Sequence, residues 1–144
     1  MPTRNNIRLT LMDAKIMLEG VEKKAAETGV PMDIAVVDDG GNLLAFHRME
    51  GAKITSIDVA ISKAYTAAAA RTPTHKYGEI AQPGGPAFGI FVSNQGRFMI
   101  VGGGLPILIE GQVVGGIGVS SGTADQDREV AQAGIDTLLR SLSS

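Results

Sequence analysis

Apolar side chains recur between residues 11 and 25 at alternating spacings of three and four, which is the pattern of a helix with one buried face. Thr10 and Asp13 form a capping-box pattern at the start of this segment, and Gly29 followed by Pro31 is typical of a helix end. The sequence therefore predicts a first helix. Its inner face comprises Leu11, Ala14, Leu18, Val21 and Ala25.

Two short β-prone runs follow at residues 34–37 and 43–47, and a polar, glycine-containing turn separates them. Apolar runs on both sides of such a turn are typical of a β-hairpin. We therefore expect two adjacent antiparallel strands in the first third of the chain.

A second helix is predicted to start near Thr55, because Thr55 and Asp58 have the spacing of a helix cap. It ends at Thr72, since the residue before Pro73 avoids the helical conformation. The alanines at 67–70 leave little side-chain bulk, so the helix is expected to pack close to a sheet or to another subunit. Its inner face comprises Ile57, Ile61, Ala64 and Ala68.

The second half of the chain begins with an irregular stretch at residues 74–89, which is rich in glycine and proline. Three β-prone runs follow at 98–101, 107–109 and 113–119. A short Glu-Gly-Gln turn joins the last two, and we expect a second hairpin there.

The final helix is predicted to begin at Thr123, where Gln126 completes a capping box. Its inner face comprises Ala131, Ile135, Leu138 and Leu142. Two hairpins and three helices, without regular strand–helix alternation, predict an α+β fold in which helices pack on an antiparallel sheet. Residues 1–144 are expected to form a single domain, since domains usually contain about 100–200 residues.

Composition narrows the classes of function. The net charge is −2 and the basic residues form no cluster, so a nucleic-acid partner is not expected. The absence of cysteine excludes disulfides, thiolate metal sites and cysteine nucleophiles. No segment approaches the roughly 18 apolar residues that span a membrane, and residues 1–6 carry no apolar signal core. We therefore expect a cytoplasmic protein without a membrane partner.

Residues 118–122 read Gly-Val-Ser-Ser-Gly, the pattern of a serine-hydrolase elbow, between a predicted strand and a predicted helix. A hydrolase of that fold places its histidine after the serine, whereas His47 and His75 both precede it. We therefore favour the interpretation that these glycines allow the last strand to turn sharply into its helix.

A second glycine-rich segment, Gly-Gly-Gly-Leu-Pro at 102–106, follows a predicted strand. Consecutive backbone amides of such a segment can bind an anion, and glycine also permits a close approach of another backbone or of a ligand. Neither of the common nucleotide-binding glycine patterns is present. A turn and a ligand-lining loop remain the two interpretations.

Several polar residues are candidates for chemistry. His47 and Glu50 would supply only two metal ligands, fewer than a metal site normally needs, so no metal site is predicted. His47 and His75 are the candidate axial ligands if the protein binds haem iron. Lys63 is either a buried base or anion-binding group, or a side chain that extends to solvent. The acids at turns and caps are expected to have structural roles: Asp38, Asp39, Asp125 and Asp127.

Taken together, these segments resemble the GlcG/HbpS-like family, whose domain also forms the C-terminal part of PduO-type proteins. The resemblance covers residues 9–139 and implies a profilin-like α-β-α fold with a five-stranded antiparallel sheet. It also implies homo-oligomers, haem binding in some members, and genes near glycolate, glycerol or propanediol metabolism for others. The matching segments are residues 34–38, 41–43, 48–52, 63–64, 102–107, 114–120 and 125–127.

The leading hypothesis is a small-molecule-binding protein, with haem or another tetrapyrrole as the candidate ligand, bound between subunits or between sheet and helix. One alternative is an isomerase or lyase of carbon-source catabolism with Lys63 or His47 as its base. A second alternative is a non-catalytic accessory subunit of a homo-oligomer. The expected ligand-binding residues are Arg48, Glu50, Gly51, Lys63, Gly103, Gly104, Leu105, Pro106 and Ser120.

Overall fold

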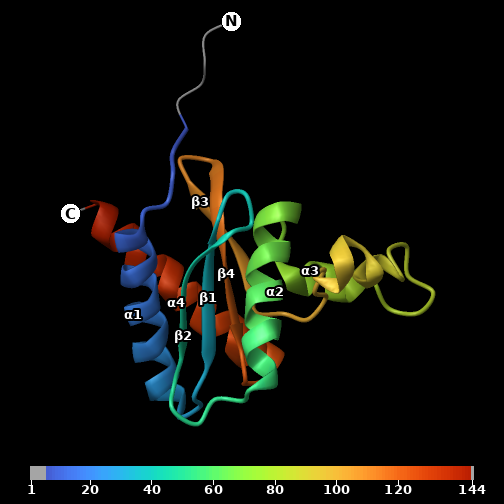
Figure 1. Ribbon diagram of the computed structural model, residues 1–144, viewed down its shortest axis with the longest axis horizontal. Helices are drawn as coiled ribbons and strands as arrows, with labels where there is room; N and C mark the ends of the chain where they lie inside the picture. Colours follow the sequence, from blue (N-terminus) through green and yellow to red (C-terminus); the bar gives the residue numbers. More distant parts are fainter. Residues whose placement is uncertain (1–5, 144) are drawn as a thin grey trace, which may run out of the picture.

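A computed structural model describes residues 6–143, so most of the N-terminal segment expected to lack a signal core lies outside the described residues. Four antiparallel strands form one sheet in the order β2-β1-β4-β3, and helices flank it (Figure 1). The elements are α1 Leu11–Thr28, β1 Asp33–Asp38, β2 Leu43–Arg48, α2 Thr55–Ala70, α3 Thr74–Ile80, the short 3-10 helices η1 Ile90–Val92 and η2 Asn94–Gly96, β3 Gly104–Ile109, β4 Gln112–Ser120 and α4 Ala124–Ser143.

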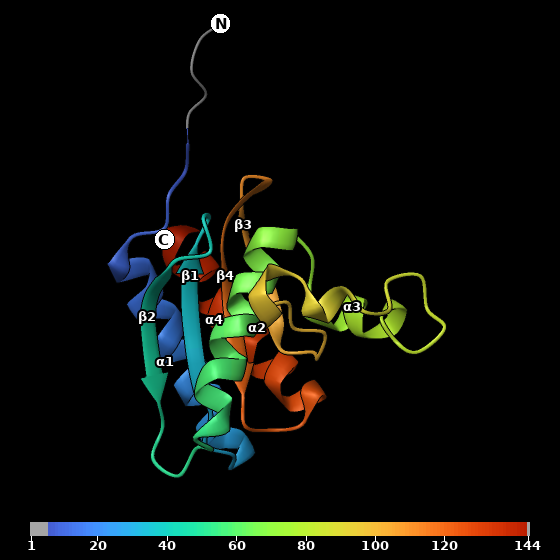
Figure 2. The ribbon, with the colours of Figure 1, turned by 45° about the vertical axis from the view of Figure 1, so that its right-hand side comes forward.

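The sheet lies between two helical layers, because α2 covers one face while α1 and α4 cover the other (Figures 1 and 2). Side chains alternate along β1 accordingly. Ile34 and Val36 join the larger core beneath α1 and α4, whereas Ala35 and Val37 face the alanines of α2. The α+β class and the predicted packing of helices on an antiparallel sheet are thus confirmed.

Close packing of α2 depends on glycine in β4. A Cβ atom at Gly116 would overlap the carbonyl oxygen of Ala64, and one at Gly118 would overlap that of Ala60. The helix therefore rests on the strand backbone itself. The expected close approach of this helix to a sheet is confirmed, and its contact face is made of small residues.

The predicted helix boundaries hold best where a local cap defines them. The capping boxes of Thr10 with Asp13 and of Thr123 with Gln126 are both present. The predicted cap at Thr55 is wrong, because α2 begins with Thr55 already helical and has no side-chain cap. Ile57 and Ile61, placed on the inner face by periodicity, are only partly buried, since the close approach of α2 favours its alanines.

The expected five-stranded sheet is wrong, since the described residues form four strands. The predicted strand at residues 98–101 is irregular. Met99 N donates instead to the Thr66 hydroxyl of α2, and Thr66 in turn donates to Arg97 O. The segment therefore hydrogen-bonds to the helix layer in place of a neighbouring strand.

Residues 74–80, expected to be irregular, form the short helix α3. Its seven residues, with Gly78 among them, are too few to produce a clear periodicity. The following residues 81–97, here called the arm, project away from the three layers (Figures 1 and 2). The arm has only one charged residue, Arg97, which stacks on the ring of Tyr65.

Candidate functional site

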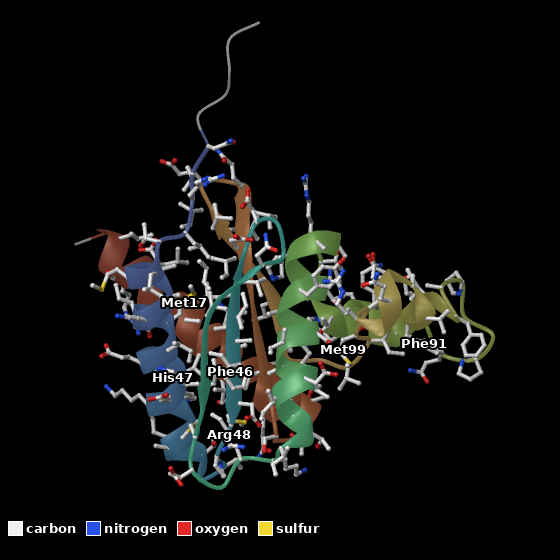
Figure 3. The ribbon with its side chains drawn as sticks, in the orientation of Figure 1. Met17, Phe46, His47, Arg48, Phe91 and Met99 are labelled. Carbon is white, nitrogen blue, oxygen red and sulfur yellow. The ribbon has the colours of Figure 1, made fainter. Side chains whose placement is uncertain are left out.

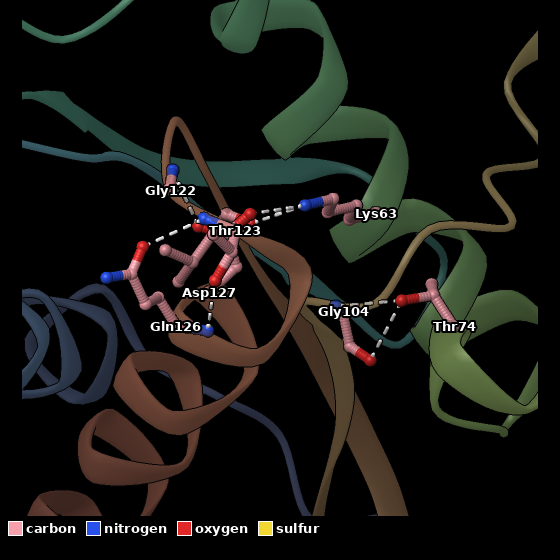
Figure 4. Close-up of polar contacts among 8 residues, drawn as sticks. Lys63, Thr74, Gly104, Gly122, Thr123, Gln126 and Asp127 are labelled. Carbon is pink, nitrogen blue, oxygen red and sulfur yellow. Dashed lines mark hydrogen bonds and ion pairs between the residues drawn. The ribbon is translucent and has the colours of Figure 1, made fainter. Parts of the chain in front are cut away.

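A buried ion pair joins three elements at the end of β4. Lys63 Nζ of α2 lies 2.9 Å from Asp127 Oδ2 of α4 and also donates to Val119 O of β4 at 2.9 Å (Figure 4). The other carboxylate oxygen of Asp127 accepts a hydrogen bond from Gly122 N. The side chains of Lys63 and Asp127 are 1% and 2% exposed. The pair therefore holds the sheet between its two helical layers.

The glycine-rich segment closes over this pair. A Cβ atom at Gly103 would lie 2.8 Å from Lys63 Nζ and 2.6 Å from Val119 O, and Gly103 has a φ of +125°. The buried hydroxyl of Thr74 bonds to both the amide and the carbonyl of Gly104 (Figure 4). Glycine is required here because the backbone itself covers the ion pair.

Burial opposes charge on both partners. It lowers the pKa of the Lys63 ammonium and raises the pKa of the Asp127 carboxyl, while their mutual attraction acts in the opposite direction. The ionised form of each side chain is thus stabilised by the opposite charge of the other. This geometry makes the pair a structural link between elements, without access for a substrate.

A second polar cluster lies where β1, β2 and β4 meet beneath the start of α2. Asp33 opens β1 and is fully buried, and its strand partners are Arg48 of β2 and Ser120 of β4. Neither carboxylate oxygen of Asp33 has a hydrogen-bond partner among the described residues. Burial raises the pKa of Asp33, and the charge of Arg48 partly offsets this effect.

The two histidines occupy different environments. His47 is exposed and its Nδ1 lies 2.5 Å from Glu22 of α1, on the sheet face opposite α2 (Figure 3). His75 of α3 is partly buried beside Gly102, and its Nδ1 is buried without a partner among the described residues. Burial, followed by the nearby charge of Arg128, lowers the pKa of His75, so its ring is neutral near pH 7.

Five of the nine predicted ligand-binding residues fall into two clusters, and the other four are scattered. Lys63, Gly103 and Gly104 meet at the ion pair, while Arg48 and Ser120 flank Asp33. The remaining four lie apart from both clusters. They are Glu50 and Gly51 in an exposed loop, Leu105 in the core beneath α1 and α4, and Pro106 on the edge strand β3.

Two residues of these clusters were not predicted as site residues. Asp127 was assigned to helix capping, because its position in the first turn of a helix already explains an acid. Asp33 was not considered. An acid directly before the apolar run at 34–37 was the available signal, since the alternation of β1 places it on the α2 face.

The hydrolase and metal interpretations find no support in the recorded contacts of residues 6–143. Ser121 Oγ accepts a hydrogen bond from Lys53 N, and Ser120 is buried opposite Asp33. No group of three or more metal-ligating side chains occurs among these residues.

Two hollows of the described residues, neither lined by a histidine, lie on different sides of the fold. A groove of about 840 Å³ between α1 and α4 is lined mainly by charged side chains of both signs, and a small cavity of about 100 Å³ lies beside Tyr65 and Phe98. Pockets for drug-sized ligands measure roughly 300–1,000 Å³ and are mostly apolar. Within the described part of the chain, no helix is long and apolar enough to cross a membrane.

Comparison with known proteins gives consistent matches over the chain. The family model for haem degrading proteins of the HbpS-like type matches residues 9–136. An uncharacterised 15.0 kDa protein of Citrobacter freundii, from the dhaT-dhaS intergenic region, is 46% identical over 128 residues, covering 89% of this chain and 90% of the relative.

Two solved structures share the fold at similar levels. ORFY of Klebsiella pneumoniae has a TM-score of 0.92 and 39% identity, covering 96% of this chain and 97% of ORFY. A complex of PduOC with haem has a TM-score of 0.87 and 31% identity, covering 91% of this chain and 95% of PduOC. Haem is thus bound by a structurally similar protein.

Proposed function

The chain belongs to the HbpS-like family, and from this premise we propose that it is a small-molecule-binding protein whose first candidate ligand is haem or a related tetrapyrrole. The proposal is supported by the haem complex of the similar PduOC domain. The order of layers, with α2 on one face of the sheet and α1 and α4 on the other, also supports the profilin-like assignment.

His75 is the single observation within this chain that carries the haem proposal. A ligating imidazole must be neutral, and burial keeps the pKa of His75 below its ordinary value of 6.5. The ring also lacks a competing partner at Nδ1, unlike His47, which pairs with Glu22. Haem would supply an iron centre at this position, and His75 would hold it from α3.

A second copy of the chain is proposed to complete the binding surface. Neither the groove between α1 and α4 nor the small cavity beside Tyr65 is lined by His75. The arm that follows α3 presents apolar side chains to solvent, with Phe88 56% and Val92 74% exposed, and Phe88 packs edge to face on Phe91. Phe91 lies far out on the arm (Figure 3). We therefore propose a homo-oligomer in which the arm contacts a neighbouring copy.

The alternative of an isomerase or lyase is less well supported. Of its two alternative bases, Lys63 is buried in an ion pair with Asp127, and His47 is exposed and paired with Glu22. For the alternative of an accessory subunit the expected interface is the alanine-rich second helix, but Ala60, Ala64 and Ala68 of α2 pack against the sheet of the same chain. A role in glycolate, glycerol or propanediol catabolism remains part of the proposal, because it rests on the resemblance alone.

Haem titration of the purified protein, followed by visible absorption, tests the proposal. We expect a saturable Soret shift at a fixed stoichiometry that His75→Ala abolishes and the matched variant His47→Ala preserves. Light scattering on the same samples reports the oligomer. A weak, unsaturable change in the unmodified protein, or a Soret shift unaffected by His75→Ala, would contradict the assignment.

A further inference from the structure

Asp33 is a fully buried carboxylate for which the described residues provide no hydrogen-bond donor. We propose that Asp33 is the recognition group of a separate binding site for a small neutral polyol, located beneath the first turn of α2. Leaving a buried carboxylate without donors is costly, and the hydroxyl groups of such a ligand would supply them. The site goes beyond the proposed haem function and does not depend on it.

The strand register places Asp33 on the face that α2 covers. Asp33 alternates with Ala35 and Val37, which both pack against the alanines of that helix. Ala60 of α2 lies over Gly118 of β4, so one turn earlier the helix passes over Ser120, the strand partner of Asp33.

The residue one turn before Ala60 is Ser56, and it is buried. Two serine hydroxyls, those of Ser56 and Ser120, therefore lie in the same layer as the carboxylate of Asp33. Serine hydroxyls donate as well as accept, so they complement an alcohol, which does the same.

The start of α2 adds a second feature to this site. The helix has 16 residues, and its N-cap residue Ile54 makes no side-chain capping hydrogen bond. Ser56 N and Ile57 N of the first turn already donate to Lys53 O and Ile54 O, so the helix start contributes mainly the partial positive charge of its dipole. The layer that holds Asp33 therefore lies beneath a helix start without a side-chain capping hydrogen bond.

The surrounding charges select the class of ligand. Arg48 and the helix N-terminus both disfavour a cation, while the carboxylate of Asp33 disfavours an anion. A neutral molecule with at least two hydroxyl groups satisfies both constraints. One hydroxyl would donate to Asp33, and the oxygen of another would accept from a serine hydroxyl.

The segment between β2 and α2 leads into the first turn of the helix and would provide the route of entry. A hydrogen bond of 3.1 Å from Lys53 N to Ser121 Oγ ties this segment to the residue that follows β4. Ile54 in the same segment is 75% exposed. Displacement of this segment would open the layer beneath the first turn of α2 without separating the sheet from the remaining turns of the helix.

NMR titration with glycerol as the probe tests the proposal. At this molecular mass the amides of residues 33–35 and 120 and the Asp33 carboxyl carbon are suitable reporters. We expect saturable shifts with glycerol and none with 1,2-dimethoxyethane, which has the oxygens but no hydroxyl donor. Saturation is the criterion because polyols also act on proteins by exclusion from the surface, an effect without a plateau.

Variants assign the site. Asp33→Asn removes the charge without changing the shape, and we expect glycerol to bind at least about tenfold more weakly, as for the loss of a hydrogen bond to a charged group. The matched control Asp39→Asn changes an exposed acid and should leave binding unchanged. Ser56→Ala should weaken binding while the spectrum retains its dispersion.

Three outcomes would overturn the proposal. They are unsaturable shifts with glycerol, equal affinity in Asp33→Asn, and saturable binding of glycolate in place of glycerol. Because none of them involves haem or His75, failure of the polyol site is distinguishable from failure of the proposed haem function.

Discussion

Removal of one partner from the Lys63–Asp127 pair is expected to destabilise the protein severely. Asp127→Ala leaves the Lys63 ammonium, which is 1% exposed, without a counter-ion. Breaking a buried pair in this way costs about 3–5 kcal/mol. The variant also removes the acceptor of Gly122 N, a loss of about 1 kcal/mol if that amide stays buried.

The expected loss is large relative to the whole free energy of unfolding, which is about 5–15 kcal/mol for a typical domain. With a denaturant slope of about 2 kcal/mol/M in urea, a loss of 3–5 kcal/mol shifts the unfolding midpoint by about 1.5–2.5 M. Urea unfolding followed by far-UV circular dichroism measures this shift directly.

The matched control is the surface pair of Lys24 and Glu129, which are 3.5 Å apart with side chains 34% and 59% exposed. Glu129→Ala should change the free energy of unfolding by less than about 1 kcal/mol, because water screens such pairs. The double variant Lys63→Met with Asp127→Ala removes both buried charges and should recover much of the lost stability. If the double variant is no more stable than Asp127→Ala alone, the ion-pair reasoning is refuted.

Three further predictions use the same unfolding and solution measurements. Gly103→Ala should lower the free energy of unfolding by about 3 kcal/mol or more, because its Cβ would overlap Val119 O and its φ is unfavourable for alanine. Gly84→Ala also has a positive φ but open space around it, so it should cost only about 1–2 kcal/mol. Equal costs would refute the packing argument. Folding raises the pKa of Asp33, so its contribution to stability is fully present below its unfolded pKa and is lost as pH rises through the folded pKa. In the absence of ligand, Asp33→Asn should therefore be more stable than the unmodified protein at pH 7 and should lose this advantage near pH 3.5. Urea midpoints at both pH values test this prediction. Phe88→Ser with Phe91→Ser should reduce the oligomer mass in light scattering with little change in stability, and an unchanged mass would exclude the arm from the interface.

Features with a local physical cause could be predicted from the sequence. Thr10 with Asp13 and Thr123 with Gln126 fix helix starts through hydrogen bonds that span three residues. The hairpin turn at Glu110 was equally clear, because a short polar turn between apolar runs has few alternatives. The strand predicted at residues 98–101 is wrong because a distant contact decides its conformation. The Thr66 hydroxyl, which accepts a hydrogen bond from Met99 N, cannot be inferred from the β-prone side chains of this segment.

The candidate site depended on contacts between distant residues. Lys63 was singled out, but its partner Asp127 is 64 positions away and carried a sufficient local explanation as a helix-start acid. The register that places Asp33 opposite Ser120 likewise exists only once β1 and β4 pair. For the glycines of 102–104 the sequence leaves a turn and a ligand-lining loop open, and the structure places the ion pair and the backbone of α2 against Gly103 and Gly104.

The strand order has a consequence for synthesis of the protein on the ribosome. β1 can pair with β2 as soon as both strands have left the ribosome. The partner of its other edge, β4, lies about 75 residues later in the chain and is synthesised only afterwards. During that interval an apolar strand, Asp-Ile-Ala-Val-Val-Asp, has one open edge, and open apolar edges promote pairing between chains. The acids at both ends of β1 flank the apolar residues with charge, as gatekeeper residues do in other strands prone to aggregation. A nascent chain stalled before β4 is therefore the form of this protein most exposed to aggregation.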